Sequence, residues 1–251
     1  MFEDLKIKSH KGFYKASFYN DLSEVIRKID CSNSHIIIDE NVYIIYSKLF
    51  NSLLHKKDFL VIKSTEKNKS LEKMPLYVNW LVKNKIRRSH KLVAIGGGII
   101  QDITCFISAT LLRGMDWDFI PTTLLSQADS CIGSKSSINC NNVKNILGTF
   151  TPPKEIFICT EFLSSLKNIE IKSGIGEMLK VHAIAGPHVF KNIKSEYDQL
   201  FFNKKKIKRN EVTVAFITGN GLKTLDAMGD FPRPISTTPN LESFEAAINN
   251  N

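Results

Sequence analysis

Three glycines followed by an acid form the segment best suited to bind a phosphorylated ligand. Gly96, Gly97 and Gly98 come directly after the apolar run Leu92–Ile95, and Asp102 follows four residues later. Glycines at the end of a strand let a ligand approach the backbone, and the start of the next helix presents free N–H groups to a pyrophosphate. A purely structural turn is an equally good interpretation. Asp102 would be an acid of the first helical turn or an acceptor for ribose hydroxyl groups.

Two hydroxyl side chains and a lysine-containing loop form a second group. Thr122 and Thr123 lie at an expected junction between a strand and a helix, where they could contact a ligand or simply cap the helix. Lys135 lies among small residues in the segment 133–137, which we expect to be a loop. An ammonium group beside exposed backbone N–H groups is typical of an anion-binding loop. A solvated lysine without a ligand is the alternative interpretation.

Glu177 and Lys180 form a third candidate pair. They are three residues apart in a segment with helical periodicity, so both side chains lie on one face of the expected helix. A plain ion pair is one interpretation. The other is a carboxylate metal ligand beside a lysine that binds substrate.

The segments that must position these residues alternate between strand-like and helix-like patterns. Helical spacing of apolar residues occurs in segments 71–86 and 99–112 and again from Asn168 onward. Short apolar runs predict strands at 35–39, 59–62, 92–95 and 118–121. Strand, helix and strand in this order indicate an α/β fold with a parallel sheet and crossover helices. The segment 212–217 predicts a further strand in a tail that otherwise contains turns and prolines.

Composition and charge exclude several classes of protein. The chain has 251 residues, 43% hydrophobic and 24% charged, which is typical of a globular protein. Its net charge of +9 suits an anionic small molecule, whereas its lysines are scattered apart from the run 204–209, so nucleic acid is not an expected partner. No apolar run has the length of a signal peptide or a membrane span, which favours a cytoplasmic location without a membrane partner. The five cysteines contain no CxxC motif and support neither a zinc knuckle nor a disulfide framework.

Taken in order, these residues closely resemble the motifs of the 3-dehydroquinate synthases and related sugar-phosphate cyclases, over about residues 35–200. The matching positions are Asp39–Asn41, Glu66, Lys69, 96–98, Asp102, 112–114, 121–125, Asp129, 133–135, Lys144, Asn145, Gly148, 162–163, 176–177 and Lys180. The resemblance implies a Rossmann-like, NAD-binding α/β domain over residues 1–165. It also implies a truncated α-helical domain over residues 166–208, with the active site in the cleft between the two.

The same resemblance implies a role for each matching residue. NAD would be bound at its adenosine end by Asp39 and Asn41, at the ribose by Glu66 and Lys69, at the pyrophosphate by Gly97, Gly98 and Asp102, and on the nicotinamide side by Thr122, Thr123, Lys144, Phe162 and Ser165. The substrate would be bound by Asp129, Lys135, Asn145 and Lys180. Arg113 would reach the substrate phosphate of the neighbouring subunit in a homodimer, and Glu177 would bind a divalent zinc or cobalt ion.

The implied activity is the NAD- and metal-dependent cyclisation of 3-deoxy-D-arabino-heptulosonate 7-phosphate, with elimination of phosphate, in the shikimate pathway. Two departures leave alternatives open. The segment Gly133–Ser136 reads Gly-Ser-Lys-Ser where the family has Gly-Gly-Lys-Thr, which leaves room for another sugar phosphate. The family also needs two downstream histidines, but the last histidine here is His188, and His182 is five residues from Glu177. We therefore expect an incomplete metal site, and the alternative is an inactive remnant or fusion that binds only NAD.

The tail from residue 209 to residue 251 has a different resemblance. Residues 214–226 resemble the C-terminal end of threonine synthase, in which the residue matching Thr218 contacts the pyridine nitrogen of pyridoxal phosphate. Nothing upstream resembles the lysine-bearing core of that enzyme, so pyridoxal phosphate is not an expected cofactor. We expect the cyclase-like part to end near Arg209 and to be joined there to a foreign end.

Overall fold

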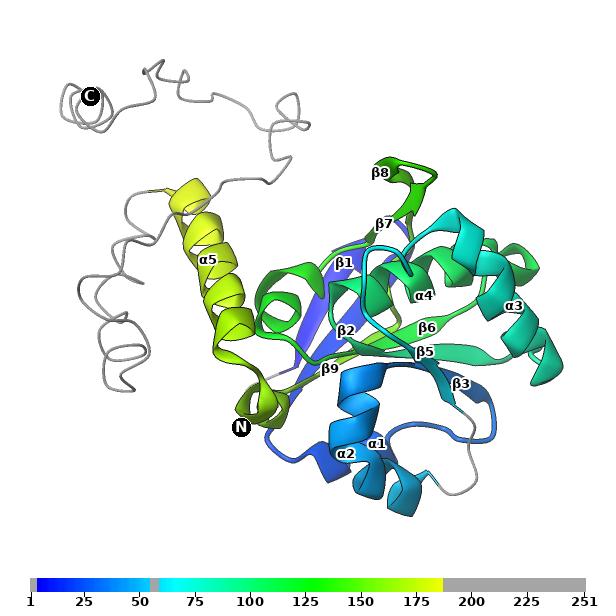
Figure 1. Cartoon of the computed structure of the whole chain (residues 1–251). Coiled ribbons are helices and arrows are strands. Elements are labelled where there is room, and N and C mark those ends of the chain that lie inside the picture. Colours follow the sequence, from blue (N-terminus) through cyan, green and yellow to red (C-terminus); the bar gives the residue numbers. More distant parts are fainter. Residues whose placement is uncertain (1–3, 55–58, 187–251) are drawn as a thin grey trace. The chain divides into compact units, whose positions relative to one another are not determined.

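A seven-stranded sheet with helices on both faces forms the centre of the chain (Figure 1). The structure is a computed structural model that describes residues 4–54 and 59–186. The strands of this sheet are β1 (Leu5–Ser9), β2 (Gly12–Tyr19), β3 (Ser34–Asp39), β4 (Phe59–Ile62), β5 (Lys91–Gly96), β6 (Trp117–Pro121) and β9 (Glu155–Cys159). The helices are α1 (Leu22–Arg27), α2 (Glu40–Leu53), α3 (Met74–Lys83), α4 (Gly98–Thr110) and α5 (Asn168–Ala185). A separate two-stranded hairpin consists of β7 (Lys135–Cys140) and β8 (Val143–Phe150).

The sheet is parallel except at one edge. Its strand order is β1-β2-β9-β6-β5-β3-β4, and only β1 pairs antiparallel, with β2. The predicted α/β fold with a parallel sheet is therefore confirmed for the described residues. The four predicted strands correspond to β3, β4, β5 and β6, whereas β1, β2, β9 and the hairpin had no counterpart in the sequence-based prediction.

Both faces of the central strands are buried, which explains why these strands read as continuous apolar runs. Side chains such as Ile37 and Phe119 belong to the core that contains residues of α3 and α4. Their neighbours along the same strands, such as Ile36 and Ile120, belong to the core that contains residues of α1 and α2. Successive side chains of a strand point to opposite faces, so the sheet separates two helical layers.

The carboxyl ends of β3 and β5 form the switch point of this sheet. The chain passes from β3 to β4 on one side and then crosses to β5 on the other side of β3. The helix after β3, α2, packs on one face, and the helix after β5, α4, packs on the opposite face. Two adjacent strands whose following helices diverge leave a crevice between them, where α/β proteins bind ligands.

Several predicted helix boundaries differ from the structure. The helix expected at 99–112 ends at Thr110 and continues as a 3-10 turn, in which Leu112 and Arg113 have positive φ angles of 52° and 66°. The helix expected at 71–86 starts with a 3-10 turn, Leu71–Lys73, and the α-helical part ends at Lys83. The predicted strand at 212–217, the basic run at 204–209 and the tail from residue 209 lie outside the described residues. The proposed domain boundaries remain predictions.

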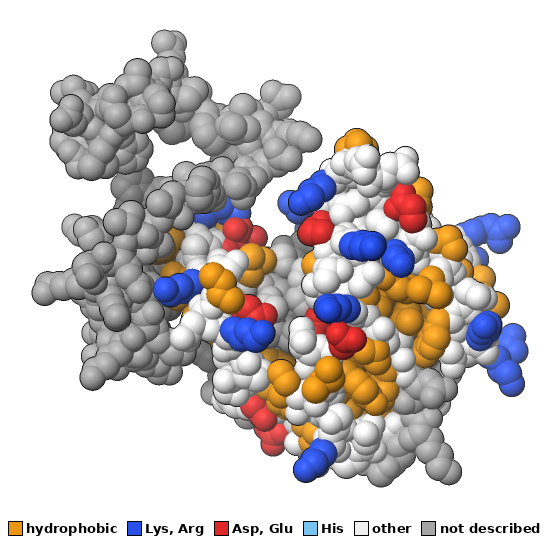
Figure 2. Space-filling view, in the orientation of Figure 1, with side chains coloured by type: hydrophobic (Ala, Val, Ile, Leu, Met, Phe, Trp, Pro, Cys, Tyr) orange, Lys and Arg blue, Asp and Glu red, His pale blue; other side chains and the backbone are white. Residues whose placement is uncertain are grey.

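The described surface carries mixed charge. In the view of Figure 2, Lys and Arg side chains lie at separate places, with acidic and hydrophobic side chains between them. Within the described residues, no helix has the length and apolar character needed to cross a bilayer. All five cysteines lie in the described segments as free thiols, and three of them, Cys105, Cys131 and Cys159, are buried.

Candidate functional site

A cavity of about 320 Å³ lies at the switch point, and we refer to it as the switch-point cavity. Its walls come from the ends of β3, β4, β5, β6 and β9, from the residues that follow them, and from the start of α5. The lining residues are Asp39, Asn41, Val42, Ile45, Ser64, Gly97, Gly98, Ile99, Thr122, Thr123, Phe162, Ser165, Leu166, Lys167 and Glu170. Eight of these residues were predicted from the sequence to contact a dinucleotide.

Gly97 and Gly98 line the cavity at the first turn of α4 and have no side chains to cover this turn. A Cβ at Gly97 would lie 2.9 Å from Thr123 Cγ2, whereas a Cβ at Gly98 would meet nothing within 4 Å. Gly97 is the N-cap and has no side chain to satisfy the first N–H groups of the helix. These N–H groups and the helix dipole therefore remain available to an anionic group in the cavity.

Asp39 has both a structural role and a place in the cavity wall. Its carboxylate accepts hydrogen bonds from the N–H groups of Asn41 (2.7 Å) and Val42 (3.1 Å), so it caps α2. The Ser64 hydroxyl group donates to the other carboxylate oxygen. Asp39 thus ties the ends of β3 and β4 together beside the cavity.

The opposite wall contains Thr122, Thr123, Phe162 and Ser165. Thr123 Oγ1 accepts a hydrogen bond from the N–H of Ser126 (3.2 Å), which confirms its expected capping role. The helix expected after it is only a short turn that includes a π segment, Ser126–Ser130. On the far side of this wall, the Tyr46 hydroxyl group lies 3.0 Å from Ser165 Oγ, and its ring packs edge-on against Phe162.

A second, more open cavity of about 430 Å³ adjoins the first, and we call it the adjoining cavity. The two share Gly98, Ile99, Thr123 and Glu170. The adjoining cavity brings in Glu66, Lys69 and Asp102, all predicted cofactor contacts. Asp102 is not an acid of the first helical turn, because it is the fifth residue of α4.

Lys69 links the acids of the adjoining cavity to the hairpin. It is only 6% exposed, and its Nζ lies 3.1 Å from Asp102 Oδ2, 2.9 Å from Asn145 Oδ1 and 3.6 Å from Glu66 Oε1. Burial raises the pKa of Asp102 even though the charge of Lys69 opposes this shift. The pKa of Glu66 is lowered, first of all by a hydrogen bond from the Asn139 side chain.

The segment around Lys135 is not the loop that the sequence predicts. Lys135 is exposed and is the first residue of β7, where it pairs with Phe150 of β8. The hairpin needs a glycine at position 148, because β7 and β8 approach each other closely there. A Cβ at Gly148 would lie 2.3 Å from Ser136 O. Lys144 is exposed on β8 and borders a separate hollow that also contains Glu66. It does not line the switch-point cavity, which contains Gly98 and Thr122.

The residues expected to serve substrate and metal lie on different elements. Glu177 and Lys180 form an ion pair on α5, as the simpler interpretation predicted. Asp129 lies partly buried in the π segment. His182 Nδ1 contacts Met178 O at 2.7 Å. In the part of the chain that the structure describes, no three His, Cys, Asp or Glu side chains come together as a metal site would require.

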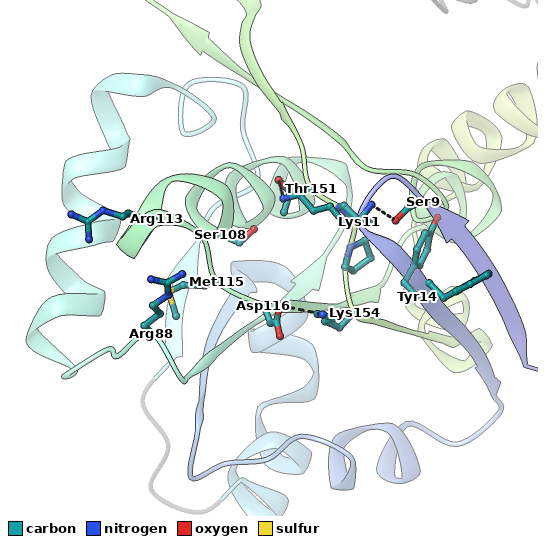
Figure 3. Close-up of a pocket in the computed structure, with 14 residues that line it drawn as sticks. Ser9, Lys11, Tyr14, Arg88, Ser108, Arg113, Met115, Asp116, Thr151 and Lys154 are labelled. Carbon is teal, nitrogen blue, oxygen red and sulfur yellow. Dashed lines mark hydrogen bonds and ion pairs between the residues drawn. The ribbon is translucent and has the colours of Figure 1, made fainter. Parts of the chain in front are cut away.

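Arg113 borders a third cavity, of about 450 Å³, at the edge of the sheet where β5, β6 and β9 begin (Figure 3). We call it the amino-edge cavity. Figure 3 shows the guanidinium groups of Arg88 and Arg113 on one side of it and Lys11 and Lys154 on the other. Asp116 is the one carboxylate among its lining residues, and it lies 3.6 Å from Lys154 Nζ. Arg113 is therefore at the opposite edge of the sheet from the switch-point cavity.

The sequence-based prediction missed four residues of this region: Ser64, Asn139, Lys167 and Glu170. Ser64 follows a predicted strand, and the carboxyl ends of parallel strands meet at one edge, so this signal was present. Lys167 and Glu170 open α5, where the Glu170 carboxylate accepts a hydrogen bond from the N–H of Lys167. Nothing in the sequence pattern indicated that this helix start would line the cavity.

A doubly wound sheet with a glycine-opened helix at its switch point defines the class of nucleotide-binding α/β domains. Residues 59–173 match the family model of the 3-dehydroquinate synthase N-terminal domain. Over these residues, the chain is similar to the N-terminal domain of the 3-dehydroquinate synthases.

Curated relatives agree with this assignment. The chain is 34% identical over 211 residues to the 3-dehydroquinate synthase of Thermoanaerobacter pseudethanolicus, a match that covers 82% of this chain and 59% of the relative. It is 34% identical over 199 residues to the enzyme of Clostridium tetani, with 78% and 48% covered. The chain thus spans about half the length of the curated relatives that it matches.

Solved structures of sugar-phosphate cyclases share the fold. A 2-epi-5-epi-valiolone synthase from Streptomyces hygroscopicus, with NAD⁺ and Zn²⁺ bound, superposes with a TM-score of 0.66 at 27% identity, covering 74% of this chain and 54% of that one. A 2-deoxy-scyllo-inosose synthase complexed with carbaglucose-6-phosphate, NAD⁺ and Co²⁺ gives a TM-score of 0.63 at 23% identity, with 72% and 51% covered. The second likeness shows the fold alone.

Proposed function

We propose that the chain binds NAD in the switch-point cavity. The observation that carries this proposal is the exposed first turn of α4, with no side chain on Gly97 or Gly98 to cover it. The cavity fits the cofactor, because a pyrophosphate can accept hydrogen bonds from these N–H groups. A cyclase with the same fold is known with NAD⁺ bound.

The proposed contacts follow the walls of the two cavities. Asp39 and Asn41 would face the adenosine end, Glu66 and Lys69 the ribose, and Thr122 with Thr123 the nicotinamide side. Phe162 and Ser165 line the same cavity as Thr122 and Thr123, which supports their assignment to the nicotinamide side. The remaining proposed contacts are Gly97, Gly98 and Asp102 for the pyrophosphate. Lys144 borders neither of the two cavities, and only the resemblance supports its proposed contact on the nicotinamide side.

The proposed reaction is that of 3-dehydroquinate synthase, in which 3-deoxy-D-arabino-heptulosonate 7-phosphate cyclises and loses phosphate. Bound NAD would supply reversible removal of a hydride from a ring alcohol. Lys135 and Lys180 would bind the anionic groups of the substrate as ammonium ions, and Asp129 and Asn145 would bind its hydroxyl groups. The partly buried contact of Asn145 Oδ1 with Lys69 Nζ supports a shared boundary between the cofactor and substrate regions.

The described residues do not fit a divalent metal by themselves. Glu177 would be one ligand, but it is paired with Lys180, and a single carboxylate does not make a tight site. We therefore derive no step of the reaction through a metal, although the relatives with known structures include forms with Zn²⁺ and Co²⁺.

Arg113 supports a homodimer in this proposal. Its position in the amino-edge cavity, with Lys11, Arg88 and Lys154 nearby, suits a phosphate that another molecule presents. A substrate phosphate in the site of a second copy is such a group.

Two alternatives remain within the same fold. The first is a chain that binds NAD without turnover, which the ion pair of Glu177 with Lys180 favours. The second is a related cyclase that acts on another sugar phosphate, which the Gly-Ser-Lys-Ser sequence at 133–136 favours.

An assay of phosphate release from the heptulosonate phosphate, with the full chain, NAD and either zinc or cobalt, separates these possibilities. We expect release that requires NAD and that falls at least about tenfold in Lys180→Ala. NAD binding without release would favour the inactive alternative. Release only from another sugar phosphate would favour the related cyclase, and release that does not need NAD would contradict the proposal.

A further inference from the structure

Asn139 connects the acid on the ribose side of the site to the hairpin that carries Lys144 and Asn145. It is the fifth residue of β7 and is 7% exposed. Its Nδ2 donates to the backbone oxygen of Glu66 (3.1 Å) and to Glu66 Oε2 (3.0 Å). Its Oδ1 accepts a hydrogen bond from the N–H of Asn145 (2.9 Å). One buried amide therefore contacts both sides of the proposed site.

The backbone of Asn139 strengthens the same connection. Its N–H donates to Lys69 O (2.9 Å), and Lys69 in turn contacts Asn145 Oδ1 through its ammonium group. Asn145 has a positive φ of 54°, a conformation that is uncommon outside glycine and that asparagine adopts more readily than most other residues. The hydrogen bond from its N–H to Asn139 Oδ1 stabilises this conformation.

No residue of similar size other than asparagine can make both side-chain hydrogen bonds. An aspartate accepts from the N–H of Asn145 but cannot donate to Glu66, and its charge would repel that carboxylate. An alanine makes neither bond and leaves the partly buried polar groups of Glu66 and Asn145 without this partner. Aspartate thus removes the hydrogen bond to Glu66 alone, and alanine removes both hydrogen bonds.

We propose that Asn139 is a positioning residue that holds Glu66 and Asn145 in their binding positions as a unit. The Asn139 amide would then fix the position of one residue on the cofactor side, Glu66, and one on the substrate side, Asn145. This inference rests on the proposed function for the roles of Glu66 and Asn145.

The first test needs no ligand. In the full chain, NMR hydrogen exchange at the Asn145 amide should speed up at least about tenfold in Asn139→Ala and stay close to the wild-type rate in Asn139→Asp. Asn142→Ala, an exposed asparagine in the turn of the same hairpin, is the matched control and should leave this rate unchanged. Equal exchange in Asn139→Ala and wild type would overturn the proposal.

The second test measures NAD affinity against pH by calorimetry. The hydrogen bond from Asn139 lowers the pKa of Glu66, so an ionised Glu66 should persist to lower pH in the wild type than in either Asn139 variant. As the pH falls, we therefore expect Asn139→Asp to lose NAD affinity at a higher pH than the wild type. At neutral pH, its affinity should already be about tenfold weaker, because two carboxylates now face each other.

A double-variant comparison separates positioning from general damage to the fold. If Asn139 acts through Glu66, Asn139→Asp should weaken NAD binding in the wild-type background and have almost no further effect in Glu66→Gln. Equal losses in both backgrounds would overturn the proposal. Failure of the wild type to bind NAD would instead refute the proposed function, and the exchange result would still decide the role of Asn139 in the hairpin.

Discussion

Lys69 and Asp102 form an ion pair of 3.1 Å between Nζ and Oδ2, with 7% of the Lys69 side chain exposed. The pair joins the segment after β4 to the second turn of α4. The same ammonium group contacts Asn145 of the hairpin. Three segments that border the proposed cofactor site therefore depend on one buried cation.

Removal of this cation should destabilise the protein. Lys69→Met leaves Asp102 without its charged partner, and breaking a buried pair costs about 3 kcal/mol or more. We expect a decrease of this size in the free energy of unfolding, measured by denaturant titration. Lys67→Met, at an exposed lysine of the same segment, should change it by less than about 0.5 kcal/mol. Similar values for the two variants would show that the pair contributes no stability.

Two glycines of α5 provide a matched test of how this helix packs. A Cβ at Gly174 would lie 2.6 Å from Leu124 Cβ and 2.8 Å from the Leu125 backbone nitrogen, whereas a Cβ at Gly176 would meet nothing within 4 Å. Gly174→Ala should therefore lower the free energy of unfolding by about 1–3 kcal/mol. Gly176→Ala should raise it by up to about 1 kcal/mol, because alanine is the better helix former. Thermal unfolding of both variants would show this opposite response, and a stable Gly174→Ala would contradict the observed packing.

The cysteines should divide into two groups by reactivity. Burial raises the pKa of Cys131 to about 12 and also raises the pKa of Cys105 and Cys159. Thiolate is the reactive form, so these three should not react in the native protein at mildly alkaline pH, whereas the partly exposed Cys31 and Cys140 should. A colorimetric thiol assay should count two thiols in the native protein and five after denaturation. A rapid reaction of all five without denaturant would contradict the buried positions.

The sheet and its glycine turn could be predicted from the sequence because their signals are local. The run before Gly96 is apolar on both faces, and glycines followed by helical periodicity indicate the turn. The hairpin was missed because its signal is weak: the turn at Asn141, with a φ of 50°, contains no glycine, and β8 is exposed along much of its length.

The burial of Lys69 could not be predicted, because its partners Asp102 and Asn145 are 33 and 76 positions away. A lysine is normally exposed, and only the folded arrangement supplies the acids that make its burial favourable. By contrast, Asp39 could be assigned as a possible ligand contact and Thr123 as a possible ligand contact or helix cap. The structure gives both residues a capping role and a place at the cavity.

Calorimetric titration of the full chain and of Gly98→Val with NAD tests the proposed cofactor site most directly. A Cβ at Gly98 meets no protein atom within 4 Å, so we expect the variant to fold and its side chain to block the first turn of α4. We expect saturable binding of NAD to the wild type and an affinity at least about tenfold weaker in Gly98→Val, at an unchanged melting temperature. No binding to the wild type, or equal binding to the two proteins, would contradict NAD binding at the switch point.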